Sequence, residues 1–389
     1  MPRLITKRTG QNGRVSWQAR VPVGLGPTGK PLHDTKTFQT HREAKDHVTK
    51  IRQERVEGRT TTPSKMTLNR YLDEWIERER TNKTVRSQTA ESYAGVLTRY
   101  IRPGLGNVRL AELTPLSVQR QVDALARLGL SPRTVAYALS LLRKALKDAV
   151  RLRLLPSNPA ADVRPPRRVR GEMPAFNEDQ ARAFVAALQD TKHETLFLLA
   201  LLTGMRPGEY LALKWDDLNL RDPADCSVTV RRVLVQDSHG WHFDEPKTLR
   251  SRRTIPIPDV LAPALKRHKT AQAEQRLALG EAWEDHGLVF TNEVGAPLDR
   301  KNLLRRHFRP LLRQAGLPEK IRLYDLRHSA ATLLLGLGVH PKIASERLGH
   351  ASITQTLDTY SHVMPTMQRE ATDKLEQLLL QPRSQAPGT

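Results

Sequence analysis

The feature that most constrains the fold of this chain is a segment rich in proline and arginine near its middle. Residues 156–174 contain five prolines and four arginines. Proline fixes φ and lacks a backbone N–H, so this segment cannot continue a helix or lie in the centre of a sheet. It predicts an extended, basic linker, and a chain of 389 residues has room for two or three domains around it.

Positive charge is concentrated before this linker. The formal net charge is +22, of which residues 1–62 carry +8, residues 63–170 carry +12 and residues 171–389 only +2. Cations that neutralise phosphates release condensed counterions, so this charge favours a polyanionic partner, either nucleic acid or an acidic membrane. The second half of the chain is balanced in charge, which predicts a different role for it.

Several classes of protein are excluded by composition. The single cysteine, Cys226, cannot form an internal disulfide or a cysteine-based zinc site. The first residues, MPRLITKRTG, lack an apolar signal region, and no stretch reaches the roughly 18 apolar residues of a membrane span. An aromatic content of 5% is low for a protein that stacks single-stranded bases on many rings. We therefore expect a soluble, cytoplasmic protein with no membrane partner.

Residues 14–58 predict a small sheet and one helix. Arg14–Val23 alternates in polarity, a glycine-rich turn follows, and Leu32–Phe38 is a second candidate strand. Thr40 and Glu43 form a capping box for a basic helix that runs to about residue 58. Such a sheet can enter a DNA groove, but the pattern fits a small adaptor domain with a solvated basic face equally well.

After a predicted linker at Thr60–Ser64, residues 66–155 are helical in pattern. Thr114-Pro115 and Ser131-Pro132 are typical first residues of helices. The last helix of this part, predicted over Val135–Leu155, is apolar on one face. We expect its basic side chains to contact phosphates: Arg143, Lys144, Lys147, Arg151 and Arg153.

The second half predicts a mixed unit with helices at residues 177–188 and 195–202. Ser227–Val235 and Arg253–Ile257 are predicted strands, with Gly240–Phe243 on a middle strand between them, and residues 258–380 are mostly helical. The predicted fold class is multidomain and mainly α with small β elements. A C-terminal apolar stripe fits either a core helix or a helix that packs on a neighbouring protomer: Ala371, Leu375, Leu378 and Leu379.

The candidate site residues lie in short motifs of this second half. In Thr203–Glu209, Gly204 permits a tight turn and Pro207 suits a first helical turn. Tyr324–Ser329 begins a helix, Lys247 lies between strand candidates, and Leu348-Gly349-His350 precedes Tyr360 by ten residues. Each residue alone fits an ordinary surface or packing role, so only the order and spacing carry information.

In that order and spacing the chain resembles the tyrosine recombinases, in particular the phage-type, lambda integrase-like branch, over nearly its whole length. The resemblance implies that Arg206 and Arg327 bind the scissile phosphate and that Tyr360 is the nucleophile. It implies that Lys247 is the general acid for the leaving 5′ oxygen, and that His350 is the histidine of the Leu-Gly-His element. Arg250, Arg252 and Arg253 lie close to Lys247, so this stretch offers several cations.

One position departs from the family pattern, because Tyr324 occupies the place where His-x-x-Arg commonly has its histidine. A phenol can donate a hydrogen bond to a phosphate oxygen but is a poor base near neutral pH. We expect Tyr324 to keep a positioning role, and His328 to face away because one residue turns a helix by about 100°. Glu209 is expected to support the arginine turn without doing chemistry.

The residue types fit strand exchange without metal or ATP. Arginine forks bind the charge of a phosphoryl transition state, and a phosphotyrosyl ester conserves the bond energy for resealing. The sequence has no cluster of acidic residues at metal-ligand spacing in this region and no phosphate-binding P-loop, so no cofactor is expected. The predicted division is an arm-type DNA-binding domain at 1–62, a helical core-binding domain at 66–160, a linker at 161–174, a catalytic domain at 175–380 and a polar tail at 381–389.

The resemblance also implies partners: double-stranded DNA attachment sites, a homotetramer on two such sites, and room for a host bending factor and an excisionase in a bacterial cytoplasm. Three alternatives stay open. A type IB topoisomerase-like enzyme would use the same chemistry without exchanging strands. A DNA-binding protein with an inactive site is favoured only by Tyr324, and a metal-dependent transposase lacks a placed acidic triad.

Overall fold

The computed structural model describes residues 4–9, 14–25, 31–56, 66–82, 85–167, 173–222, 225–237, 240–246, 251–350 and 352–360, with 372, 373, 375, 376 and 379. The chain divides into two compact units, Met1–Arg170 and Gly171–Thr389. The predicted linker at Thr60–Ser64 and the tail at 381–389 lie outside the described residues. Among the helices that are described, none has the length and apolar sequence needed to cross a membrane.

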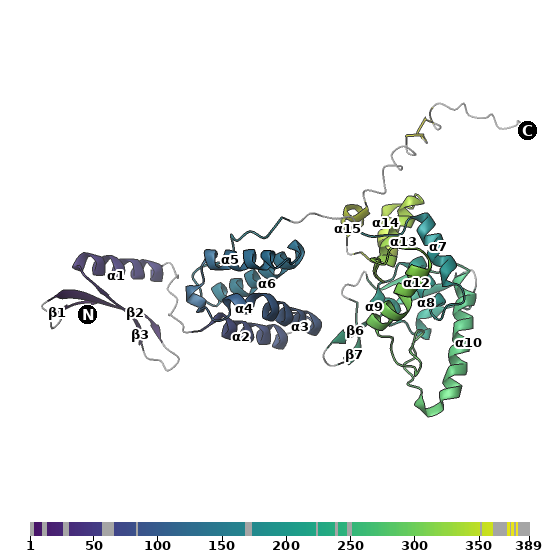
Figure 1. Ribbon diagram of the computed structural model, residues 1–389, viewed down its shortest axis with the longest axis horizontal. Helices are drawn as coiled ribbons and strands as arrows, with labels where there is room; N and C mark the ends of the chain where they lie inside the picture. The colour runs from purple at the N-terminus through teal and green to yellow at the C-terminus, as the bar shows by residue number, and fades with distance from the viewer. Residues whose placement is uncertain are drawn as a thin grey trace, which may run out of the picture. The chain divides into compact units, whose positions relative to one another are not determined.

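The first unit begins with an antiparallel sheet backed by one helix (Figure 1). The predicted strands and helix are present, and an additional strand, β1, precedes them. The capping box is confirmed, since Thr40 N donates to Glu43 Oε2 at 3.3 Å and Glu43 N donates to Thr40 Oγ1 at 3.2 Å. The elements are β1 (Ile5–Thr9), β2 (Val15–Leu25), β3 (Pro31–Phe38) and α1 (His41–Val56).

Helix α1 packs against one face of this sheet, and among the described residues no other helix packs closely on the opposite face, called here the open face. Ala19 and Val21 of β2 are buried with Ala44 and Val48 of α1. Because side chains alternate along a strand, Gln18 and Arg20 lie on the opposite face. Gln18 pairs with Thr6 of β1 and Thr37 of β3, and Arg20 pairs with Thr35. The open face is therefore lined by polar side chains, defined here as Thr6, Arg8, Ser16, Gln18, Arg20, Thr35 and Thr37.

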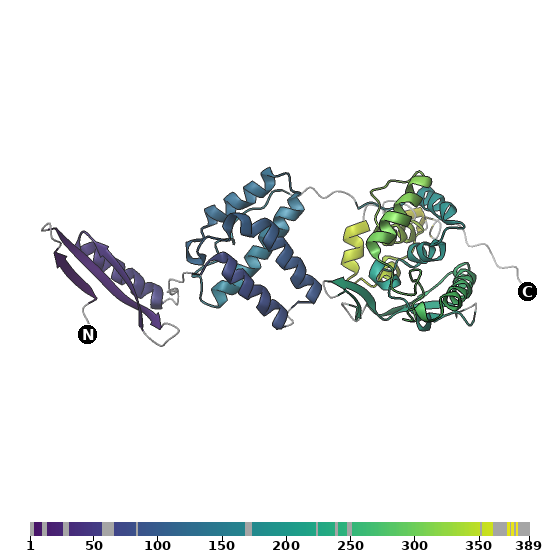
Figure 2. The same cartoon turned by 60° about the horizontal axis from the view of Figure 1, so that its bottom comes forward.

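A helical bundle with its own core completes the first unit (Figure 2). Both predicted proline starts are confirmed, with the Thr114 and Ser131 hydroxyls accepting from the backbone N–H groups of Ser117 and Thr134. Tyr71 OH donates to Ala145 O at 2.5 Å and ties the first helix to the last. The helices are α2 (Leu68–Thr81), α3 (Ser87–Val96), α4 (Arg102–Leu105), α5 (Pro115–Arg127) and α6 (Pro132–Arg151), with a π-helical turn at Leu97–Ile101.

Two of the basic side chains of α6 serve the bundle itself. Arg143 Nε donates to Ala160 O at 2.7 Å, and its guanidinium also reaches Val163 O. Lys144 Nζ pairs with the buried Glu79 at 2.6 Å. Val163 is itself buried in the bundle core, so the packed structure continues past residue 161, where the linker was predicted to begin. The expected phosphate contacts of Lys147, Arg151 and Arg153 stay a prediction, and Arg151 also pairs with Asp148 at 3.2 Å.

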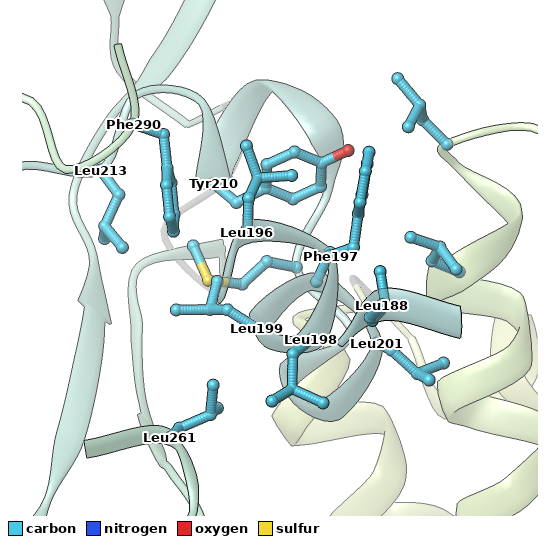
Figure 3. Packing of buried hydrophobic residues seen from close by; sticks show 14 of the residues in the cluster. Leu188, Leu196, Phe197, Leu198, Leu199, Leu201, Tyr210, Leu213, Leu261 and Phe290 are labelled. Carbon is cyan, nitrogen blue, oxygen red and sulfur yellow. The ribbon is translucent and has the colours of Figure 1, made fainter. Parts of the chain in front are cut away.

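The second unit is built around α8 (Glu194–Thr203), a helix that is apolar on every side (Figure 3). A helix without a polar face is stable only when it is surrounded by other elements. Leu196, Phe197 and Leu199 are each at most 1% exposed, and α7 (Glu178–Leu188) packs beside them. This central helix leads directly into the motif of Arg206, so the core fixes the position of that arginine.

The predicted strands of this unit are present, but Ser227–Val235 is divided into two strands that lie in separate sheets. β5 (Ser227–Val230) pairs with β4 (Leu218–Asn219) and β8 (Arg253–Pro256), whereas β6 (Val233–Asp237) and β7 (Gly240–Asp244) form a separate hairpin. Gly240–Phe243 is thus not a middle strand between the other two. Arg231 and Arg232 interrupt the predicted strand, and Arg232 forms an ion pair with the buried Asp217 where β5 ends.

Helices make up most of the described chain after β8, as predicted. Leu375 and Leu379 of the C-terminal stripe are 57% and 68% exposed, so they do not belong to a core within this chain, and Ala371 and Leu378 lie outside the described residues. The remaining helices are α9 (Pro207–Tyr210), α10 (Leu261–Leu279), α11 (Arg300–Asn302), α12 (Arg309–Gln314), α13 (Asp325–Gly336), α14 (Pro341–Leu348) and α15 (Ile353–Tyr360).

Candidate active site

A glycine brings the arginine turn against two other helices. Gly204 follows α8 with φ of +65°, a left-handed conformation that favours glycine. A Cβ atom at this position would lie 2.7 Å from Leu348 Cδ2 of α14 and 3.4 Å from Ala330 Cβ of α13. The turn that carries Arg206 therefore packs directly on the helices that carry Arg327 and precede His350.

Arg206 stands at the start of α9 and is held by Glu209. Arg206 N donates to Glu209 Oε2 at 2.9 Å and Arg206 NH1 donates to Glu209 Oε1 at 2.8 Å, while NH2 donates to Gly349 O at 3.2 Å. Burial opposes the charge of Arg206, but Glu209 and the phenol of Tyr324 outweigh it and raise the pKa of this arginine. Glu209 thus has the supporting position that the sequence predicted.

Arg327 is the most deeply buried cation of the site. It is 1% exposed, and its NH1 donates to Gly204 O at 2.9 Å. Within the described part of the chain its buried NH2 group has no hydrogen-bond partner. Burial and the nearby charge of Arg206 lower the pKa of Arg327 to about 10, so the guanidinium stays charged at neutral pH. Two cations from separate elements therefore lie close together, and the NH2 group of Arg327 has no hydrogen-bond partner among the described residues.

His350 lies beside these cations in a neutral state. It follows Gly349, the left-handed residue that ends α14, and is 8% exposed. Burial, followed by the charges of Arg327 and Arg206, lowers the pKa of His350 to about 3. Its Nδ1 lies 2.7 Å from the Oγ1 of Thr356. A neutral imidazole in this place can donate or accept one hydrogen bond at Nε2 without adding charge.

Tyr324 precedes α13 and is 39% exposed. The phenol of Tyr324 raises the pKa of Arg206 and therefore lies beside the Arg206 guanidinium. The ring centroid of His328 lies 5.2 Å from that of Tyr324, and His328 is buried. The expectation that His328 faces away from the phosphate stays a prediction.

Sequence reasoning missed Arg253 as a member of this site. Its NH2 donates to Glu209 Oε2 at 2.9 Å and its Nε donates to Arg347 O at 2.6 Å. Burial would raise the pKa of Glu209, but Arg253, followed by Arg206, lowers it below the usual range. The period of two residues in β8 could have identified Arg253, because it shares the strand face of the buried Ile255 and Ile257.

Four of the six predicted site residues are thus brought together: Arg206, Tyr324, Arg327 and His350. Lys247 lies outside the described residues. Tyr360 is the last residue of α15, but its side chain is outside the described part of the structure. Helix α15 packs against α14 and α13, the helices on which the site is built.

Such a site is built to hold an anion between fixed cations, with a neutral donor at its edge and a helix that ends in a tyrosine packed against it. This combination on a mainly helical unit fits a tyrosine-type strand-transfer enzyme. The model of the phage integrase family matches residues 174–367, and that of the phage integrase N-terminal SAM-like domain matches residues 67–126. The chain belongs to the phage integrase family, and it is therefore an enzyme that breaks and rejoins DNA strands. The predicted family and fold class are confirmed.

Curated relatives match the chain over almost its full length. An integrase of Streptomyces ambofaciens is 30% identical over 362 residues, covering 92% of each chain. A XerC-like tyrosine recombinase of Caldanaerobacter subterraneus is 28% identical over 390 residues, covering 95% of this chain and 98% of its own.

Solved structures share the fold at lower identity. The integrase of transposon Tn1549, in complex with a circular intermediate DNA, has a TM-score of 0.64 and 22% identity, and covers 80% of this chain and 99% of its own. A lambda integrase dimer bound to a core site has a TM-score of 0.54 and 19% identity, and covers 92% and 95%.

Proposed function

We propose that this recombinase cuts DNA through attack of the Tyr360 hydroxyl on a phosphodiester held by Arg206 and Arg327. The new bond joins the tyrosine oxygen to phosphorus, and the bond from phosphorus to the 5′ oxygen breaks. The proton of Tyr360 passes to a water molecule, and Lys247 gives a proton to the 5′ oxygen. The product is a 3′-phosphotyrosyl bond, which a 5′ hydroxyl of a second strand can attack in reverse without ATP.

The observation that supports this proposal is the buried NH2 group of Arg327, which has no hydrogen-bond partner among the described residues. A buried charged group that lacks a hydrogen-bond partner destabilises the fold. Such a group is retained where a ligand supplies the missing hydrogen bond. The equatorial oxygens of a phosphoryl transition state gain negative charge, and fixed guanidinium groups stabilise that charge in advance. The neutral His350 supports the same chemistry, since it can donate from Nε2 to a third oxygen.

DNA is the substrate that fits both halves of the chain. Residues 1–170 carry +20 of the net charge, and the solved neighbours are integrases in complex with DNA. We propose that residues 66–160 and the catalytic domain at 175–380 bind the core site, and that residues 1–62 bind arm-type DNA. The open face of β1–β3 supports the second assignment, since its amide, hydroxyl and guanidinium groups suit the base edges of a major groove.

The assembly we propose is a tetramer on two attachment sites, acting on a mobile element in a bacterial cytoplasm. A lambda integrase tetramer has been solved on a Holliday junction, with a TM-score of 0.53 to this chain and 19% identity. Strand exchange between two marked duplexes tests this assembly. Relaxation of supercoils without exchange would favour the topoisomerase-like alternative.

The test of the nucleophile uses a supercoiled plasmid that carries the DNA flanking the protein's own gene. The reaction contains chelator and no ATP, and detergent stops it before covalent protein–DNA adducts are measured. We expect an adduct with the wild type and none with Tyr360→Phe. Tyr137→Phe, an exposed tyrosine of the helical bundle, is the matched control and should react like the wild type. An adduct that survives Tyr360→Phe would refute the assignment and make Tyr324 the next candidate.

A further inference from the structure

A side chain that contacts the ring of His350 lies on α15, the helix that ends at Tyr360. Thr356 is fully buried in α15, and its Oγ1 lies 2.7 Å from His350 Nδ1. Residues four apart lie on the same face of a helix, so Thr356 and Tyr360 share one face of α15. One turn of α15 therefore contacts His350 through Thr356, and the next turn ends at Tyr360, the proposed nucleophile.

The backbone around His350 is fixed by other contacts. His350 N donates to Ser345 O at 3.0 Å, and the preceding Gly349 O accepts from Arg206. The ring itself can still rotate about its side-chain bonds, so its orientation depends on what its nitrogens contact. In the described structure Nδ1 faces Thr356, which leaves Nε2 for the substrate.

The Thr356 contact can also decide which nitrogen carries the proton, because a hydroxyl that donates to Nδ1 requires this nitrogen to be unprotonated. His350 is neutral, because burial and the nearby charges of Arg327, Arg206 and Arg253 lower its pKa. A neutral imidazole has one N–H, and the hydrogen bond at one nitrogen sets the role of the other. A hydroxyl that donates to Nδ1 leaves the proton on Nε2, which then donates to a phosphate oxygen.

We propose that Thr356 is a positioning residue that holds His350 as its Nε2–H tautomer and couples this state to the docking of α15. When α15 is docked, the histidine is oriented for the phosphate at the same time as Tyr360 approaches. When α15 leaves, His350 loses the partner of Nδ1, and its tautomer is no longer fixed. This inference rests on the proposed function for the role of the phosphate, but the histidine contact can be measured without DNA.

The test compares two substitutions that differ in the hydroxyl. Thr356→Val keeps the volume and β-branch but removes the hydroxyl, and Thr356→Ser keeps the hydroxyl but removes the methyl group. Nitrogen-15 NMR of the full chain labelled at histidine reports the tautomer, with His350→Gln assigning the signal. We expect the Nε2–H form in the wild type and Thr356→Ser, and a mixture of forms in Thr356→Val.

The rate of adduct formation on the same plasmid gives the second measurement. Thr356→Val should react about tenfold more slowly, as the loss of one hydrogen bond worth about 1.4 kcal/mol predicts, and Thr356→Ser should stay within about threefold of the wild type. DNA affinity should be unchanged in both. If Thr356→Val does not fold, Thr356→Ala removes the same hydroxyl without adding strain.

Two results would overturn the inference. One is a Thr356→Val protein with the tautomer and rate of the wild type. The other is a Thr356→Ser protein as slow as Thr356→Val, since the methyl contact would then be what matters. An adduct that survives Tyr360→Phe would instead refute the proposed nucleophile, while the tautomer measured without DNA would still test Thr356.

Discussion

Replacing Glu209 by glutamine should strongly destabilise the catalytic unit. Glu209 is 2% exposed and accepts hydrogen bonds from the backbone and side chain of Arg206 and from Arg253. Removing one partner of a buried ion pair costs roughly 3–5 kcal/mol because the remaining charge is left uncompensated. Arg206 is 29% exposed and glutamine keeps one oxygen acceptor, so we expect the lower end, about 3 kcal/mol.

The difference in unfolding free energy between the wild type and Glu209→Gln should depend on pH, which gives an independent check of the role of Glu209. The pKa of Glu209 is lowered in the folded protein from its ordinary value of 4.5, because Arg253 and Arg206 outweigh its burial. A carboxylate with a lowered folded pKa stabilises the fold fully above its unfolded pKa, and this contribution is lost as the pH falls through the folded pKa. The gap between wild type and Glu209→Gln should therefore be constant near neutral pH and narrow in acid, below the ordinary pKa of 4.5.

Urea unfolding at several pH values measures this gap. Glu178→Gln is the control, because Glu178 forms an exposed pair with Arg182 and should change stability by less than about 0.5 kcal/mol. A gap below about 1 kcal/mol at neutral pH, or one that does not narrow in acid, would refute the reasoning that two arginines depend on this carboxylate.

Three further predictions concern the site and the bundle. Arg327→Lys keeps the charge but loses the forked pair of N–H donors. The rate of adduct formation should therefore fall about 10²–10³-fold while DNA binding is retained. An unchanged rate would mean that Arg327 does not hold the phosphate. Tyr324→Phe removes the phenol oxygen beside Arg206 and should slow adduct formation about tenfold or less in the same assay, and an inactive variant would assign Tyr324 a larger role than positioning. Thr114→Ala removes the cap of α5 and should lower the unfolding free energy of the bundle by about 1 kcal/mol in urea, whereas no change would show that the capping box is dispensable.

Much of the local structure could be read from the sequence. The capping box at Thr40, the proline starts after Thr114 and Ser131, and the tight turn at Gly204 were all predicted and are all present. These features depend on contacts between residues three or four apart. A short stretch of sequence therefore contains both partners of each contact. The residues of the arginine turn, Tyr324 and the Leu-Gly-His element were likewise identified from their order and spacing.

The tertiary structure decided the contacts between segments that lie far apart in the chain. Arg206 meets Gly349 across 143 residues, and Arg327 meets Gly204 across 123. The sequence could show that Arg253 shares a strand face with buried residues, but it could not show that Arg253 binds Glu209 or that Arg143 serves the bundle. The partners of these arginines lie in other parts of the chain. The sequence did not give the pairing of the strands either, since pairing depends on which edges the core brings together. Local hydrogen bonds are determined by neighbours in the sequence, whereas the environment of a buried charge is determined by the packing of the whole unit.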